Sequence, residues 1–283
     1  MILKNFKSVK HAANMAITEL LISGGKELAG KWQATDKFAD MKMLVLRNYF
    51  LSITNIDWCD SCLAIETGCD IAWCNMHFEE RISGNPTNPG EAYKHWPYHK
   101  NLDESEFKDD KFSHTYQERF WPKAVEVYTE DVQRHLYLTG KLNINDPDNN
   151  IGLRFPLGDL EDVIQQLADN HLTRQAFLPI WFPEDTWAAN NSKRVPCTLG
   201  YYFYIQGGKL HCNYIIRSCD AYRHFRNDLY LTLKLQKYVA EEIGIEPGNL
   251  DFLIFNFHIF ENDMYSIQKK ENKIRGYEFG KNN

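Results

Sequence analysis

The sequence lacks an apolar run long enough to cross a membrane. No stretch approaches the roughly 18 to 20 consecutive apolar residues that a transmembrane helix needs. The first residues, MILKNFKSVKHAANMAITELL, contain polar side chains throughout and no small-residue cleavage site, so no signal peptide is expected. We therefore expect a cytoplasmic protein that has no membrane partner.

An excess of positive charge is also missing. The chain has 32 Lys and Arg residues against 38 Asp and Glu residues, which gives a formal net charge of −6 at pH 7. Proteins that coat nucleic acid are usually basic because they neutralise backbone phosphates. The composition therefore argues against a nucleic-acid partner, although it is compatible with a local cationic pocket for one phosphate.

The seven cysteines lack the even number and the spacing of a small secreted disulfide framework, and they favour reduced thiols. Cys59 and Cys62 in WCDSC have the spacing of a redox motif, but that motif needs a strand-to-helix turn, which the surrounding pattern does not clearly predict. Together with Cys69 and Cys74 they could alternatively bind zinc, although the gaps are short for paired knuckles. We expect free thiols and no metal.

The 283 residues, of which 43% are hydrophobic, are enough for one large domain. Helical periodicity and stop signals predict helices at residues 8–23, 159–172 and 229–244. Alternation and branched or aromatic residues predict strands at 41–54 and 251–262. The mixture indicates an α+β protein with a substantial sheet.

Two segments are rich in turn-forming residues. Residues 83–111 are rich in Pro, Gly, Asn and acidic residues, which predicts a loop organised around one short helix. Residues 140–150, GKLNINDPDNN, predict a second polar loop.

A β-hairpin is predicted around Gly207 and Gly208, a two-residue turn signal between two β-rich stretches. If the residues beside the turn pair, Cys197 lies opposite Ser218 and diagonal to Arg217. A guanidinium beside a thiol favours the thiolate and lowers the thiol pKa. An isolated cysteine is more often a small buried hydrophobe, but this register favours a nucleophile.

Several short motifs follow one another in a specific order. They are Pro196-Cys197, Arg217-Ser218-Cys219-Asp220, Asp228 eight residues later, and His258-Ile259-Phe260 on a strand whose alternation groups Phe252, Ile254, Asn256, His258 and Phe260 on one face. In this order the motifs resemble the thymidylate synthase family. The segments FSHTYQERFW, DLEDVIQQLADNHLTRQ and PIWFPED resemble that family too, so the similarity covers about residues 112–265.

The resemblance implies a thymidylate synthase-like α+β fold, a large mixed or antiparallel sheet flanked by helices. Residues 1–283 would then form a single domain whose N-terminal region, about 55–111, is divergent. Two chains would pack through their sheets in a homodimer.

The resemblance also implies a role for each matched residue. Cys197 would be the nucleophile, and Arg217 and Ser218 would bind the substrate phosphate. Arg174 would bind the phosphate across the dimer, and Asp220 would bind the folate and ordered water. Tyr116 would assist proton removal from C5, and His258 would face the sugar. The family's glutamate should stand three residues before a tryptophan, where Tyr93 precedes Trp96, so the nearest acid, Glu91, is its expected replacement.

Two positions depart from the synthase pattern. Asp228 stands where the synthases have an asparagine that can both donate to and accept from uracil. A carboxylate can only accept, which suits the amino group of cytosine and resembles the phage deoxycytidylate hydroxymethylases. Phe260 replaces a tyrosine and cannot hydrogen-bond the 3′-hydroxyl, so ribose and deoxyribose both remain possible.

The activity that the resemblance implies is C5 hydroxymethylation of dCMP or CMP with 5,10-methylenetetrahydrofolate, through a Cys197 adduct at C6. This enzyme would supply modified DNA precursors in the host cytoplasm if a phage encodes it, or a nucleoside product in a bacterium. Two alternatives stay open. One is a synthase-like methylase of dCMP or dUMP, and the other is a non-catalytic relative that binds a nucleotide or a partner protein.

Overall fold

The computed structural model describes residues 2–29, 41–96, 112, 114–122, 158–190 and 194–267. The strands are β1 Ile2–Phe6, β2 Gly25–Leu28, β3 Lys42–Ile53, β4 Phe177–Pro179, β5 Thr198–Gln206, β6 Lys209–Ile216, β7 Cys219–Asp220 and β8 Glu246–Phe260. The helices are α1 Val9–Ser23, α2 Asp60–Thr67, α3 Ile71–Ile82, α4 Glu91–Lys94, α5 Tyr116–Phe120, α7 Leu160–Asp169, α8 Pro183–Asn190 and α9 Phe225–Glu242.

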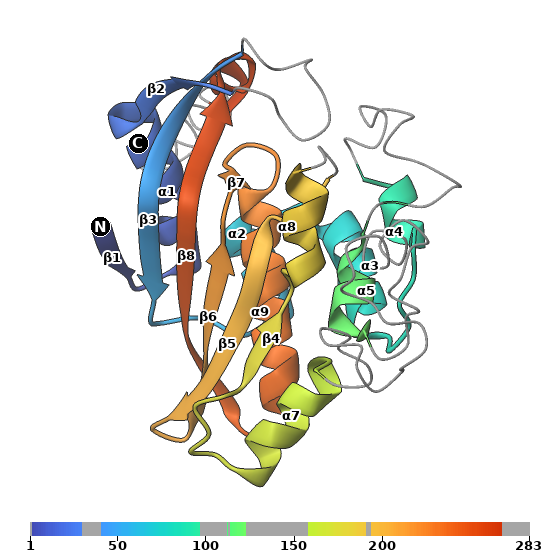
Figure 1. Ribbon diagram of the computed structural model, residues 1–283. Coiled ribbons are helices and arrows are strands. Elements are labelled where there is room, and N and C mark those ends of the chain that lie inside the picture. The colour runs from blue at the N-terminus through green and yellow to red at the C-terminus, as the bar shows by residue number, and fades with distance from the viewer. Residues whose placement is uncertain are drawn as a thin grey trace, which may run out of the picture.

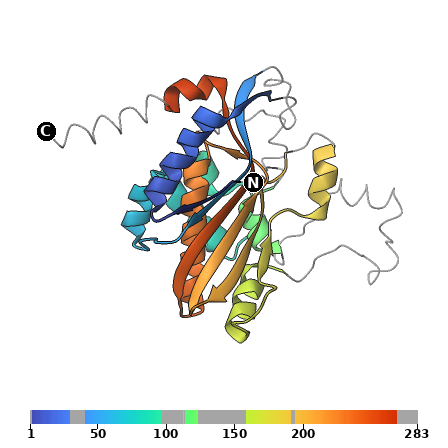
Figure 2. The same ribbon diagram turned by 90° about the vertical axis from the view of Figure 1, so that its left-hand side faces the viewer.

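One eight-stranded mixed sheet forms the centre of the structure (Figure 1). Its order is β1-β3-β8-β6-β5-β4, and β2 pairs with β3 while β7 pairs with β8. The β1–β3 and β6–β8 pairs are parallel, whereas the β3–β8 and β5–β6 pairs are antiparallel. Helices α1 and α9 cover the same face of the sheet (Figure 2). The predicted mixed sheet with flanking helices is therefore confirmed.

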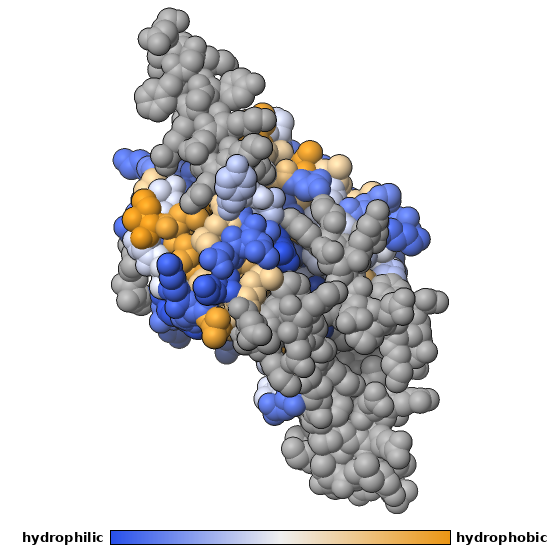
Figure 3. Space-filling model, turned by 90° about the horizontal axis from the view of Figure 1, so that it is seen from above, coloured by the Kyte–Doolittle hydropathy of each residue, from blue (hydrophilic) through white to orange (hydrophobic). Residues whose placement is uncertain are grey.

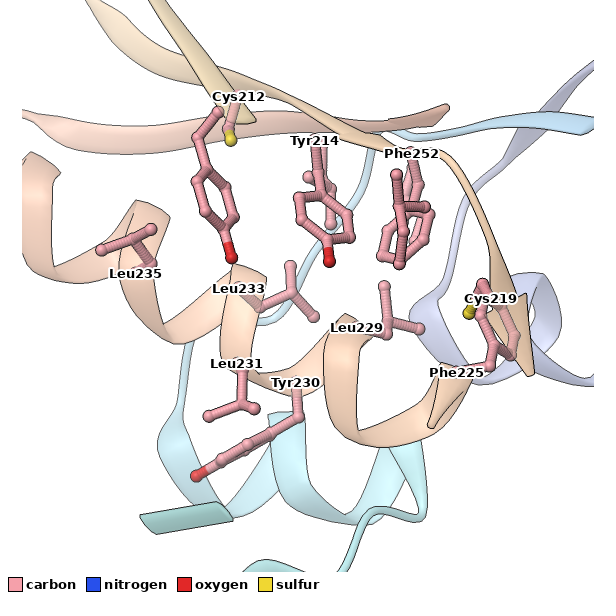
Figure 4. Packing of buried hydrophobic residues seen from close by; sticks show 14 of the residues in the cluster. Cys212, Tyr214, Cys219, Phe225, Leu229, Tyr230, Leu231, Leu233, Leu235 and Phe252 are labelled. Atoms are coloured by element: carbon pink, nitrogen blue, oxygen red, sulfur yellow. The ribbon is translucent and has the colours of Figure 1, made fainter. Parts of the chain in front are cut away.

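Helix α9 is buried on two sides, which explains its high content of large apolar residues. Leu229 and Leu233 point toward the sheet, where they meet Tyr214 and Phe252 (Figure 4). Tyr230 points away from the sheet, and its hydroxyl donates to Asn75 Oδ1 in α3 at 2.8 Å. Replacing a fully buried leucine of this helix by alanine is expected to cost about 2–5 kcal/mol.

The helices predicted at 8–23, 159–172 and 229–244 correspond to α1, α7 and α9. Ser8 caps α1 by accepting from the His11 backbone N–H at 3.1 Å, as the helix-start pattern requires. Helix α9 begins earlier than predicted, at Phe225, so that Asp228 lies in its first turn.

The β5–β6 hairpin has the predicted turn but not the predicted register at its open end. Gly207 and Gly208 both have positive φ, and pairing follows the predicted register as far as Gly200. The register then shifts by one residue at Leu199, whose carbonyl accepts the backbone N–H groups of Ile180 and Trp181. The predicted pairing of Cys197 with Ser218 is therefore wrong.

Because of this bulge, Cys197 lies opposite Arg217. The Arg217 backbone N–H donates to the Cys197 carbonyl at 2.9 Å. Gly200 permits the close approach of β4, because a Cβ there would lie 2.4 Å from the Phe177 ring and 2.7 Å from the Leu178 carbonyl.

The alternation predicted for the last strand is interrupted. Phe252 and Phe257 would lie on opposite faces of an uninterrupted strand. Both rings nevertheless contact Phe225 of α9, with distances between ring centroids of 5.7 and 4.9 Å. Opposite this part of β8, Asn48 of β3 has a φ of 53°. The single shared face predicted for residues 252–260 is therefore wrong.

Helix α4 is the short helix predicted within residues 83–111, and the part of that segment from 97 to 111 lies outside the described residues. The predicted loop at 140–150 lies outside them as well. In the described part, no helix is long and apolar enough to cross a membrane. Hydrophilic side chains stand beside hydrophobic ones on the coloured part of the upper surface (Figure 3).

Candidate active site

The predicted nucleophile, Cys197, lies directly before β5 beside a fixed guanidinium. Arg217 Nη2 is 4.0 Å from Cys197 Sγ, and Arg217 Nε donates to the Pro196 carbonyl at 2.9 Å. A second contact joins Arg217 Nη2 to the Val195 carbonyl at 3.4 Å. These contacts to the chain just before the nucleophile hold the positive charge next to the sulfur.

A second arginine acts on the same thiol. The guanidinium carbon of Arg194 lies 5.7 Å from the centre of the Trp96 ring, and its charge, like that of Arg217, lowers the Cys197 pKa. The sequence favours a solvated basic pair, Lys193-Arg194, before this strand rather than a pair that binds a ligand; in the structure the Arg194 charge acts on the buried thiol instead.

Burial nevertheless determines the protonation of Cys197. It raises the thiol pKa above its ordinary value, the two guanidinium groups oppose this, and Asp228 and Asp220 add to it. The prediction of a low-pKa thiol is therefore wrong for the protein without substrate. The residue as a whole keeps part of its surface accessible, so it is recessed rather than sealed.

A chain of three hydroxyl groups lies next to the nucleophile. The Thr198 hydroxyl is 2.9 Å from the Tyr116 hydroxyl and 2.6 Å from the Tyr214 hydroxyl. Burial raises the Tyr116 pKa, so its phenol stays protonated at neutral pH. The structure thus brings Tyr116 to the residue that follows Cys197, where the three hydroxyls can pass a proton from one to the next.

Arg81 and His77 of α3 extend the cluster, and sequence reasoning missed both. The Arg81 guanidinium carbon lies 4.1 Å from the centre of the Tyr116 ring, and Arg81 Nη2 is 3.0 Å from His77 Nε2. Because arginine only donates, Nε2 accepts and His77 Nδ1 carries the proton. Both side chains are buried, and Arg81 Nε and His77 Nδ1 have no hydrogen-bond partner among the described residues.

The carboxyl group of Asp228 is recessed in the same cluster. Cys219 Sγ lies 3.8 Å from Asp228 Oδ2, and the side chain keeps some accessible surface. Burial raises the pKa of Asp228 to about 7, against the opposing charge of Arg81. Near neutral pH the group is therefore present in both its ionised and its neutral form.

Asp220 and His258 lie next to each other on paired strands. They are partners in the β7–β8 register, and Asp220 Oδ1 accepts the backbone N–H groups of Tyr222 and Arg223 at 2.9 and 3.0 Å. Burial lowers the His258 pKa, and His258 Nδ1 has no hydrogen-bond partner among the described residues. The Phe260 ring packs edge-on against His258, with centroids 5.4 Å apart.

Three other predicted residues lie in different surroundings. Ser218 is half-buried between Arg217 and Cys219. Arg174 is exposed on the turn after α7, where it lines an open depression with Tyr202 and Tyr204 of β5.

Glu91 lies outside the buried cluster. It is exposed on α4 and accepts from Lys94 Nζ at 2.6 Å, and this partner lowers its pKa. Glu80 of α3 accepts from Gln117 Nε2 and from the Ala92 N–H at 2.7 and 2.9 Å. Arg81 and His77 contact the ring of Tyr116, whereas the carboxylate of Glu91 is exposed and paired with Lys94.

The C-terminal half of the chain resembles known sequences. The family model described as thymidylate synthase matches residues 155–277. A "Putative thymidylate synthase" of Methanosarcina barkeri is 31% identical over 117 residues, 41% of this chain and 51% of the relative. A protein with the same description from Methanosarcina mazei is 30% identical over 139 residues, 47% of this chain and 61% of the relative. The matches span little more than half the length of these two curated relatives.

The fold extends the similarity beyond this sequence match. A solved structure titled thermostable thymidylate synthase A from Bacillus subtilis superposes with a TM-score of 0.59 and 13% identity, and covers 93% of this chain and 83% of that one. At this identity the likeness concerns the fold alone, and it confirms the predicted thymidylate synthase-like architecture.

Proposed function

Residues 155–277 match the thymidylate synthase family, and from this premise we propose that the protein hydroxymethylates C5 of a cytidine monophosphate, dCMP or CMP. The one-carbon donor would be 5,10-methylenetetrahydrofolate. The observation that carries the proposal is the recessed carboxyl of Asp228, at the position that resembles the base-reading asparagine of the synthases.

The protonation of Asp228 discriminates between the two bases. Cytosine offers an amino donor at N4 and a basic N3, so one shared proton between N3 and the carboxyl group completes two hydrogen bonds. Uracil offers an N3–H donor and an O4 acceptor, so it also needs a proton on the carboxyl group; O4 is too weakly basic to take that proton, whereas N3 of cytosine can take it and so helps to retain it at higher pH. Since the Asp228 pKa is about 7 in the free protein, uracil is disfavoured progressively above neutral pH.

Cys197 would add its sulfur to C6 of the pyrimidine. The bond to C6 places an electron pair on the ring, which makes C5 nucleophilic, and the proton shared by Asp228 and N3 stabilises the resulting charge. The thiol first has to lose its proton, and Arg217 and Arg194 favour the thiolate once substrate is in place. The Tyr116–Thr198–Tyr214 hydroxyl chain would carry away the C5 proton.

A hydroxymethylase has to add water at the end of the reaction, where a synthase transfers hydride. Arg81 Nε and His77 Nδ1 would orient that water, because both are buried N–H donors without a partner among the described residues. In this role the pair would stand in for the family's glutamate, because Glu91, its expected replacement, is exposed and paired with Lys94.

The remaining contacts would position the nucleotide and the folate. Arg217 and Ser218 would bind the phosphate together with Arg174 of a second copy. A second copy is invoked because Arg174 is exposed and lies beside Tyr202 and Tyr204, apart from the residues around Cys197. Asp220 fits a folate because Oδ2, 3.7 Å from Arg223 Nε, retains acceptor capacity for the folate's N–H groups. When bound, the folate supplies the one-carbon unit.

The test is a competition experiment. The purified protein is incubated with 5,10-methylenetetrahydrofolate and equal amounts of CMP, dCMP and dUMP at pH 6.5 and 8.5, and products are identified by mass. A hydroxymethyl product on CMP or dCMP, with any dUMP product falling at pH 8.5, supports the proposal and identifies the sugar. Asp228→Asn is the matched variant and should shift the preference toward dUMP.

Two other outcomes would replace the proposal. A methyl product would favour the synthase-like methylase, which the names of the matched relatives also suggest. Binding of a nucleotide without any product, together with an unreactive Cys197, would favour a non-catalytic relative.

A further inference from the structure

A pair of cysteines lies outside the cluster around Cys197. Strand β3 ends at Ile53 and α2 begins at Asp60, with Cys59 as its N-cap residue. The WCDSC segment therefore does stand in a strand-to-helix turn, which the sequence pattern did not predict. Cys59 is exposed and Cys62 is half-buried.

Three groups surround the sulfur of Cys59. Cys62 Sγ lies 2.9 Å from Cys59 Sγ, the Cys62 backbone N–H donates to it at 3.4 Å, and the Ser61 hydroxyl lies 3.0 Å away. Hydrogen bonds to a sulfur at a helix N-terminus favour the thiolate. These hydrogen bonds lower the pKa of Cys59. The bond that the Cys62 thiol donates to Cys59 raises the pKa of Cys62 to about 12.

Asp57 completes the group. One of its carboxylate oxygens and the two sulfurs all lie within 4.8 Å of one another. Asp57 Oδ1 also accepts the Cys59 backbone N–H at 3.2 Å, which holds the carboxylate against the turn. The carboxylate is therefore placed to receive the proton of the Cys62 thiol.

The turn is anchored to the rest of the fold. Asp60 forms ion pairs with Lys234 and Lys237 of α9, at 3.0 and 2.8 Å. Helix α2 packs against α9. This support keeps the two cysteines together at the surface.

The arrangement does not provide the four-thiolate zinc site considered from the sequence. Within the described ranges, the group of possible ligands around this turn is Asp57, Cys59 and Cys62. Cys69 and Cys74 interact with each other instead, which lowers the pKa of Cys69. A structural zinc site needs four ligands, and both sulfurs would have to be ionised, whereas Cys62 donates to Cys59.

We propose that Cys59 and Cys62 form a redox-active dithiol that reduces low-molecular-weight disulfides. The Cys59 thiolate attacks one sulfur of the disulfide, forms a mixed disulfide and releases the other half as a thiolate. Cys62 gives its proton to Asp57 and attacks Cys59, which releases the second half. Two cysteine thiols are thereby oxidised to one disulfide, and the substrate disulfide is reduced to two thiols.

The test uses the reduced full-length protein and glutathione disulfide as the probe. The reaction is quenched with acid and N-ethylmaleimide, and the peptide that contains residues 59–62 is analysed by mass. The proposal predicts one Cys59–Cys62 disulfide per chain. Cys62→Ser should accumulate a glutathione adduct on Cys59, at least about tenfold faster than Cys59→Ser accumulates one on Cys62.

The matched control is Cys69→Ser, which leaves both proposed cysteines in place and should form the Cys59–Cys62 disulfide at the unchanged rate. Equal adduct rates in the Cys62→Ser and Cys59→Ser variants would overturn the proposal. So would a stoichiometric bound metal that blocks both thiols in the purified protein. None of these readouts depends on nucleotide chemistry.

Discussion

Cys197 and Cys59 are thiols of one chain whose surroundings shift the pKa in opposite directions. Cys197 has the Arg217 guanidinium at 4.0 Å, yet burial raises its pKa. Cys59 is exposed, and direct hydrogen bonds at the start of α2 lower its pKa. Hydrogen bonds to the exposed sulfur therefore lower the pKa of Cys59, whereas the nearby charge of Arg217 does not offset the effect of burial on the pKa of Cys197.

The two thiols are therefore expected to become reactive under different conditions. The thiol of Cys197 is protonated in the free protein, so its reactivity depends on groups that a substrate brings into play. Cys59 needs no substrate, because its hydrogen bonds are made within the turn. The following predictions test this contrast, in order of decreasing effect.

The largest effect is expected for Cys197→Ser. If Cys197 forms the covalent bond to the pyrimidine, this variant should lose at least roughly a thousandfold in turnover, because a serine hydroxyl is a much weaker nucleophile. Product formation and the mass of the denatured protein–substrate adduct check this. Cys69→Ser should keep the wild-type rate, and a Cys197→Ser protein with normal turnover would remove Cys197 from the mechanism.

Asp228→Asn tests how burial acts on the site around Cys197, through the pH dependence of the free energy of unfolding. The Asp228 pKa is raised to about 7 in the folded protein, so the native state binds more protons than the unfolded chain between about pH 4 and 7. This carboxyl group therefore destabilises the protein as pH rises through that range. At pH 8 the variant should be more stable by about 4 kcal/mol, and near pH 4 the difference should largely vanish.

Denaturant unfolding of both proteins at several pH values measures this difference. The comparison cancels the titration of groups that the two proteins share. A constant difference across the pH range would show that Asp228 is not the titrating group.

Much of the fold followed from sequence periodicity. The stop signals and caps of α1 and α7 are local, as is the two-glycine turn of the hairpin, and local signals are readable without a structure. The bulge at Leu199 was not predictable, because bonds from Ile180 and Trp181, distant in sequence, stabilise it. That bulge is what places Arg217 opposite Cys197.

The candidate site was predicted less completely than the fold. Motif resemblance led to Cys197, Arg217 and Tyr116, which the structure brings together. Arg81 and His77 lie on a helix without a matching motif, so nothing in the sequence marked them. The burial that raises the Cys197 pKa comes from packing against the hydrophobic core, and a pairwise register cannot predict it.

Arg217→Gln tests how much a guanidinium contributes to a buried thiol. Removing this charge should raise the Cys197 pKa further, so alkylation of Cys197 by iodoacetamide at pH 8 should slow by roughly tenfold. Rates are measured on the Cys197 peptide by mass. Alkylation of Cys59 in the same sample is the internal control, and an unchanged Cys197 rate would mean that burial alone determines its pKa.

Ser61→Ala tests the exposed side of the contrast and should have the smallest effect. The Ser61 hydroxyl lies 3.0 Å from Cys59 Sγ, while the Cys62 thiol and backbone N–H also contact that sulfur. Removing one of three groups should slow Cys59 alkylation at pH 7 by only roughly two- to threefold, because the other two remain. The same measurement on Cys62→Ala should show a larger loss, since the Cys62 thiol is the nearest of the three. The reverse order would mean that the serine, and not the partner cysteine, controls the reactivity of this turn.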